Sequence, residues 1–118
     1  MIVLRTRILE RCAQAPGNAD YVRLSAQLPP MRVEVCSDED AVALEIGPAT
    51  ARVATADRDT ALTISGGAEG WEAVLSGRHA LVRETNVYHG RLRVEGDPVL
   101  ASWSMPALAA LLRGSGET

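Results

Sequence analysis

The run from Pro98 to Leu112 carries no charged side chain, and it constrains the fold more than any other part of the chain. It is shorter than the ~18 apolar residues of a membrane-spanning helix, and Pro106 interrupts it. Asp97 and Pro98 form a strong helix start, because Asp accepts from free backbone N–H groups and Pro has none to leave unpaired. A helix that is apolar on nearly all sides must be covered on more than one side. We therefore expect a covered helix over this run, kinked or split at Pro106, with Ser104 able to cap the second piece.

Upstream of this run, apolar and polar residues alternate in short segments, which is the pattern of half-buried β-strands. The segments span residues 31–36, 41–46, 49–55, 60–65 and 91–95. Turn residues separate the first four, and the short connections favour an antiparallel meander for at least the first three. The predicted core-facing positions of this sheet are Val33, Val35, Leu44, Ile46, Leu62, Ile64 and either Leu92 or Val94.

Two further segments show the helical period. One is residues 2–14, where Ile8, Leu9 and Cys12 share a face. The other is "GGAEGWEAVLSG", which ends at Gly77 and whose apolar face consists of Ala68, Trp71, Val74 and Leu75. Residues 18–28 fit no single period, and residues 78–89 read as a loose stretch. The predicted order is helix, three strands, a fourth strand, helix, strand, helix, which is an α+β fold.

Composition excludes several classes of function. The net charge of -3 argues against nucleic-acid binding, which needs a clustered positive field. All basic residues are Arg, so neither a Schiff-base lysine nor a P-loop lysine exists. No G-x-S-x-G or H-E-x-x-H signature occurs, and we expect no enzyme, no catalytic residue and no cofactor. His79 and His89 lack nearby cysteines, so we expect no zinc site, and the acidic "SDED" at 37–40 reads as a solvated turn rather than a calcium site.

The cysteines and the N-terminal segment bear on the cellular compartment. Cys12 and Cys36 could form one disulfide, but two cysteines without a signal peptide are more often reduced and buried. Charged residues interrupt the apolar start too early for a signal peptide. We expect a soluble, cytoplasmic protein with one domain spanning residues 1–118.

Three motifs stand in a recognisable order. The strand "TALTIS" leads directly into "GGAEGWEAVLSG", then "GRLRVEGDP" joins a strand to a helix, and "ALAALL" follows near the end. This order and spacing resemble the sterol carrier protein type 2 family, also called non-specific lipid-transfer proteins. The resemblance is strongest over residues 60–113, weaker over 31–54, and limited to the order of elements before that.

The resemblance implies a five-stranded, largely antiparallel sheet with helices on one face and an apolar tunnel between the sheet and the C-terminal helix. It also implies non-catalytic binding or transfer of a sterol, a fatty acyl chain or a phospholipid. The typical family chain passes almost directly from the short helix to the last strand, whereas residues 78–89 intervene here. This insertion could cover or partly fill the mouth of the tunnel.

The charge-free run and the resemblance together indicate the candidate site. The expected ligand-binding residues are Val74, Leu75, Leu100, Trp103, Met105, Leu108, Leu111 and Leu112. Arg78, Arg83 and Arg91 are candidates for contact with a phosphate or carboxylate head group, because guanidinium groups form forked hydrogen bonds. A solvated loop and strand face is the plainer interpretation of these arginines.

Two functions from different classes remain open. The first is a lipid carrier, whose partner is an apolar small molecule or lipid and which would make transient membrane contact. The second is an interaction or oligomerisation module, such as a homodimer, with the same fold and a filled core. A hollow interior would favour the carrier, and a solid core with an exposed apolar patch would favour the module. For the carrier, we expect Leu108→Glu to weaken binding far more than replacement of the exposed Arg113.

Overall fold

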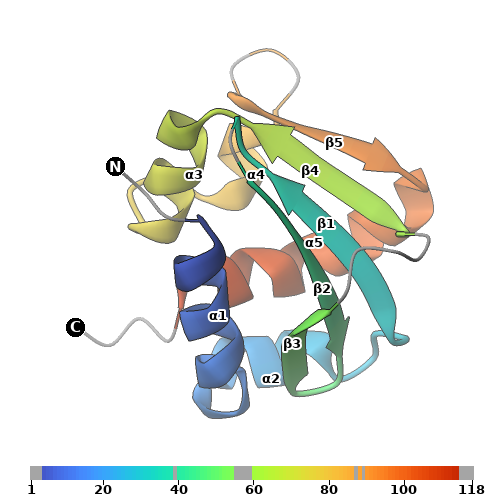
Figure 1. Cartoon of the computed structure of the whole chain (residues 1–118). Coiled ribbons are helices and arrows are strands. Elements are labelled where there is room, and N and C mark those ends of the chain that lie inside the picture. Colours follow the sequence, from blue (N-terminus) through green and yellow to red (C-terminus); the bar gives the residue numbers. More distant parts are fainter. Residues whose placement is uncertain (1–3, 39, 55–59, 87, 89, 115–118) are drawn as a thin grey trace.

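The computed structural model describes residues 4–38, 40–54, 60–86, 88 and 90–114 (Figure 1). In chain order the elements are α1 (Leu4–Gln14), the 3-10 turn η1 (Ala15–Gly17), α2 (Ala19–Ser25), β1 (Met31–Cys36), β2 (Ala41–Gly47), β3 (Thr50–Ala54), β4 (Leu62–Gly66), α3 (Ala68–Leu75), α4 (Leu81–Glu84), β5 (Leu92–Gly96) and α5 (Pro98–Arg113). All five predicted strands are present, and so are the three predicted helices.

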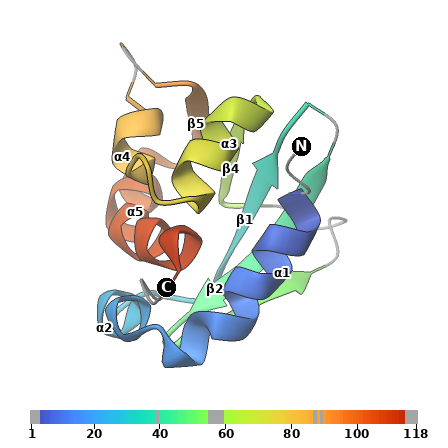
Figure 2. The ribbon, with the colours of Figure 1, turned by 90° about the vertical axis from the view of Figure 1, so that its left-hand side faces the viewer.

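The strands form one sheet in the order β3-β2-β1-β4-β5. β1, β2 and β3 make the predicted antiparallel meander, while β4 pairs with β1 in parallel and β5 pairs with β4 antiparallel. The helices gather on one side of this sheet (Figures 1 and 2). The α+β class and the five-stranded, largely antiparallel sheet are therefore confirmed.

The core lies between the sheet and the helices. The register sets Val33 opposite Leu44 and Leu62, and these side chains are fully or almost fully buried. At β5 both alternatives face the core, because Leu92 is buried and Val94 is half-buried against the same cluster. The predicted core face of the sheet is confirmed.

The other face of the sheet is polar. Glu45 of β2 lies between two arginines, with its Oε2 2.6 Å from Nη2 of Arg32 and its Oε1 2.7 Å from Nε of Arg52. Such a charged ladder on a sheet face needs water beside it, which agrees with all helices packing on the opposite side.

α1 buries Leu4, Ile8 and Cys12, whereas Leu9, predicted on the same face, is exposed. This expectation was wrong because the apolar stripe follows the i, i+4, i+8 spacing, which Leu9 does not share. Arg11 on α1 donates from Nη2 to the carbonyl of Leu75 at 2.6 Å and from Nε to the carbonyl of Leu112 at 2.8 Å. One side chain thus satisfies carbonyls at the C-terminal ends of α3 and α5.

α2 was not predicted, although its cap is readable in the sequence. Asn18 Oδ1 accepts from the backbone N–H of Tyr21, and Asn18 Nδ2 donates to the carbonyl of Ala110 on α5 at 2.9 Å. The hydroxyl of Tyr21 donates to the carbonyl of Thr50 at 2.6 Å, which fixes α2 to the β2–β3 hairpin. A helix of seven residues is too short for its hydrophobic period to stand out.

In α3 the predicted apolar face is confirmed at Trp71, Val74 and Leu75 and is wrong at Ala68. Trp71 is buried and its Nε1 donates to the carbonyl of Cys36 at 2.7 Å, but Ala68 is exposed while Gly70 and Ala73 are buried. The reason is close contact with β5, since a Cβ on Gly70 would lie 2.9 Å from Cδ2 of Leu92. The missing side chain lets the helix turn this face toward the strand.

α5 runs unbroken through Pro106, so of the two expected effects of this proline a split is wrong, and with it the cap at Ser104. Pro106 deprives only the carbonyl of Ser102 of its helical partner, and Ser102 is exposed, so water can reach that carbonyl. The hydroxyl of Ser104 instead donates back to the carbonyl of Leu100 at 2.7 Å. α5 contacts α1, α2, α3, α4 and β5, which confirms that the charge-free helix is covered on several sides.

The predicted cap of α5 is present and gives a first test. Asp97 Oδ1 accepts from the backbone N–H groups of Val99 at 2.8 Å and Leu100 at 3.3 Å. Asp97→Ala is expected to lower the free energy of unfolding by about 1 kcal/mol, because both donors lose their acceptor. Urea denaturation measures this change, and an unchanged midpoint with an unchanged slope would contradict the capping role.

Candidate functional site

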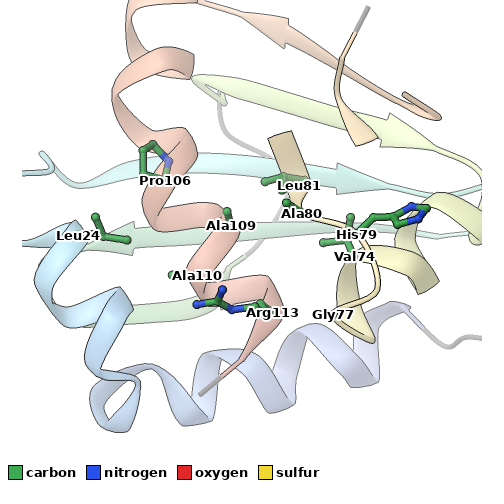
Figure 3. Close-up of a pocket in the computed structure, with 10 residues that line it drawn as sticks. All are labelled: Leu24, Val74, Gly77, His79, Ala80, Leu81, Pro106, Ala109, Ala110 and Arg113. Carbon is green, nitrogen blue, oxygen red and sulfur yellow. The ribbon is translucent and has the colours of Figure 1, made fainter. Parts of the chain in front are cut away.

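A pocket of about 260 Å³ opens between α2, α5 and the segment that joins α3 to α4 (Figure 3). Its lining residues are Leu24, Val74, Gly77, His79, Ala80, Leu81, Pro106, Ala109, Ala110 and Arg113. Most of these side chains are small and apolar, and the polar ones are His79 and Arg113.

The hollow exists because α5 carries two different stripes. Pro106, Ala109, Ala110 and Arg113 follow the i, i+3, i+4, i+7 spacing and face the pocket. Next to them Leu108, with Leu111, is fully buried in the core cluster. The large side chains fill the space beside the sheet, while the small ones leave the space beside α2 and α4 unfilled.

The opposite wall of the pocket is held by an ion pair between the buried carboxylate of Glu84 and the partly exposed Arg91. The side chain of Glu84 at the end of α4 is only 3% exposed. Arg91 donates to it from Nε at 3.1 Å and from Nη2 at 3.0 Å, and His79 Nδ1 contacts the same carboxylate. The hydrogen bonds from Arg91, more than that from His79, lower the pKa of Glu84 from 4.5 to about 2. This anchor holds α4 in place, and α4 supplies the buried Leu81 to the pocket wall.

The mouth of the pocket carries charge. Arg113 Nη2 lies 2.9 Å from Oδ2 of Asp20 on α2, and the two side chains are 55% and 51% exposed. Asp20 also pairs with Arg23 at 3.5 Å. Arg113, expected to be merely exposed, therefore also forms part of the pocket.

The predicted ligand-binding residues do not gather at this pocket. Val74 lines it, Leu100 lines a separate hollow of about 410 Å³ beside Pro29 and Pro30, Met105 is half-buried against the core, and Trp103 is exposed. The remaining predicted residues are buried core: Leu75, Leu108, Leu111 and Leu112. Their role in binding stays a prediction.

The three predicted head-group arginines also lie apart from the pocket lining. Arg78 and Arg83 are exposed, and Arg91 is held by Glu84 and by Glu69 at 3.4 Å. Of the described lining residues, the sequence predicts Val74 alone, and it misses Leu24, Gly77, His79, Ala80, Leu81, Pro106, Ala109, Ala110 and Arg113. Ala109 and Ala110 carry no sequence signal for a binding site, because the predicted ligand wall consists of large apolar side chains, whereas a hollow needs small ones.

The structure also bears on the disulfide, calcium, zinc and membrane-span hypotheses. Cys12 and Cys36 are both free thiols, and burial raises the pKa of Cys12 to about 11. Asp40 Oδ1 accepts from the N–H of Ala41, as in a simple turn, while Glu39 and His89 lie outside the described residues. Within the described ranges, no three His, Cys, Asp or Glu side chains are placed to hold a metal ion. In that same part of the chain, no helix has the length and apolarity to cross a membrane.

Comparison with solved structures identifies the fold. A sterol carrier protein 2 crystal structure superposes with a TM-score of 0.72 at 14% identity, covering 96% of this chain and 95% of that one. The chain has the sterol carrier protein 2 fold. A conserved hypothetical protein of Thermus thermophilus, suggested to be a sterol carrier protein, matches at TM-score 0.68 and 16% identity over 100% of this chain and 93% of its own. The sterol carrier protein domain 2 of Helicoverpa armigera matches at 0.53 and 16%, over 98% and 88%.

At the level of sequence, no family model and no curated protein matches the chain. The motifs that resemble the sterol carrier protein family are therefore a matter of order and spacing within a shared fold. A fold by itself does not determine a function, so function must be argued from the pocket.

Proposed function

We propose that this chain binds the apolar chain of a lipid, without catalysis, in the pocket between α2, α3, α4 and α5. One observation carries the proposal: small residues of α5, Pro106, Ala109 and Ala110, face a hollow whose other walls are mostly aliphatic (Figure 3). Ligand pockets in proteins are mostly apolar with a few polar groups, which is the composition of this one. Proteins of the same fold that carry the name sterol carrier protein support the proposal.

The proposed location differs from a tunnel between the sheet and α5. Leu108, Leu111 and Leu112 are fully buried there and fill that space. The ligand would instead lie on the side of α5 that faces α2 and α4. Leu108→Glu would then act mainly by unfolding the core and would not report on binding.

The size of the pocket bears on the kind of lipid. Its volume of about 260 Å³ is slightly below the usual range for ligand pockets, which is roughly 300–1,000 Å³. A hollow of this size suits one alkyl chain better than a fused sterol ring system. We therefore propose a single acyl or alkyl chain as the bound group.

A chain-length series tests this function. Burial of each CH₂ contributes about 0.8 kcal/mol, so the affinity of the wild-type protein should rise about fourfold per added carbon until the pocket is full, and then stop rising. Isothermal titration calorimetry with alcohols of increasing length measures the series. The proposal would be contradicted if no alcohol binds at micromolar protein concentration. It would also be contradicted if the affinity does not depend on chain length.

The second candidate function is an interaction or oligomerisation module, and one observation favours it. Val99 is 70% exposed and Trp103 is 52% exposed, one helical turn apart on α5. These residues could meet a second copy of the chain, or a membrane surface during transient contact. A dimer in light scattering that Trp103→Gln converts to a monomer, together with no lipid binding, would favour the module.

A further inference from the structure

We propose that the ligand is a single-chain lipid with an anionic head group, and that this group replaces Asp20 as the partner of Arg113. The inference rests on the proposed function and names the ligand class for the same pocket. It makes Arg113 the residue that determines which head group the protein prefers.

The charges around the pocket carry the first step. Among the described residues that line the pocket, Arg113 is the charged side chain, His79 is the other polar one, and none is acidic. The chain as a whole has a net charge of -3, so a cationic lining does not follow from the overall composition. An apolar hollow with a guanidinium at its mouth matches a lipid with an acidic head.

The second step is that Asp20 can release Arg113 at little cost in free energy. Arg113 and Asp20 are each about half exposed, and ion pairs this exposed shift an equilibrium by no more than about fivefold. When Asp20 loses Arg113 it keeps Arg23, which already contacts its Oδ1 at 3.5 Å. After the exchange the carboxylate of Asp20 would pair with Arg23, and the guanidinium of Arg113 would pair with the head group. Asp20 therefore occupies the position beside Arg113 that the head group of the ligand would take.

The third step concerns the end of α5, where free carbonyl groups would repel an anion. The carbonyl of Ala110 accepts from Asn18 Nδ2 at 2.9 Å and from the N–H of Gly114 at 3.2 Å. The carbonyl of Leu112 accepts from Arg11 Nε at 2.8 Å. Because these carbonyls are already paired, the helix end opposes an anion at Arg113 less than a bare C-terminus would.

The experiment compares ligands that share the same twelve-carbon chain and differ in the head group. Dodecanoate, dodecyl phosphate and 1-dodecanol are titrated below their micelle-forming concentrations at about pH 8, where the carboxyl and phosphate heads are ionised. The proteins are wild type, Arg113→Met and Asp20→Asn. Arg5→Met is the matched control, because Arg5 is an exposed arginine of α1 that donates to the carbonyl of Ala41 and does not line the pocket.

The wild type should bind at least one anionic ligand about fivefold more tightly than the alcohol. Arg113→Met should bind the alcohol and the anionic ligands about equally, whereas Asp20→Asn should increase the preference for an anionic head group and Arg5→Met should not alter it. A larger effect of Arg113→Met on dodecanoate would indicate a fatty acid, and a larger effect on dodecyl phosphate would indicate a phosphate head group.

Equal binding of acid and alcohol to wild type and to Arg113→Met would overturn the inference while leaving the proposed function intact. An unchanged preference in Arg113→Met would overturn it as well. If none of the three ligands binds, the proposed function fails and this inference fails with it.

Discussion

Ala109→Trp is expected to lower the affinity for an alkyl chain about 100-fold, because the indole would occupy the hollow in place of the ligand. Ala109 lies in the middle of the small-residue stripe of α5 and points into the pocket (Figure 3). Losing the burial of three to four methylene groups removes about 3 kcal/mol of binding free energy. Alcohol titrations measure the affinity, and thermal unfolding shows whether the variant keeps its fold.

Ser102→Trp is the matched control for this prediction. Ser102 is an exposed residue of the same helix and does not line the pocket, so the same large side chain should there leave binding unchanged. If Ala109→Trp keeps both the melting temperature and the affinity of the wild type, the ligand does not occupy this pocket.

Glu84→Gln is expected to lower the free energy of unfolding by about 2–3 kcal/mol at neutral pH, because a buried carboxylate loses charge-assisted hydrogen bonds. The difference from wild type should depend on pH. The pKa of Glu84 is lowered from 4.5 to about 2 in the folded protein, so its charge stabilises the fold above about pH 4.5. This contribution should shrink as the pH falls and vanish near pH 2.

Urea denaturation of wild type and variant at a series of pH values measures this difference. Glu69→Gln is the control, since Glu69 contacts the same Arg91 at 3.4 Å but is 88% exposed. It should change stability by no more than about 0.5 kcal/mol. Equal effects of the two substitutions, or a Glu84 effect independent of pH, would mean that the pair of Glu84 and Arg91 does not anchor α4.

The strands were predictable because burial on one face imposes strict alternation. In β1 the order Met31, Val33, Val35 leaves one register in which the apolar residues face the helices. The start of α5 was predictable for a similarly local reason, because a cap needs only Asp97 and the residues next to it. The order of such local patterns was enough to indicate the sterol carrier protein fold.

The pocket was not predictable, because it depends on which face of α5 meets which neighbour. Leu108 and Ala109 stand side by side in a helix that is apolar all round, and the sequence does not say which faces the sheet. The short helices α2 and α4 were not predicted, because segments this short show no clear hydrophobic periodicity. Glu84 at the end of α4 pairs with Arg91 just before β5, and no rule of residue spacing predicts this contact.

The binding of a lipid chain between α2, α4 and α5 is tested most directly with a fatty acid that carries a spin label near the end of its chain. The label broadens NMR signals of nearby groups, so the methyl signals of Leu24, Val74, Leu81 and Ala109 should weaken most, and unlabelled ligand should restore them. Broadening confined to the exposed Trp103, or equal across the protein, would contradict a lipid chain held in this pocket.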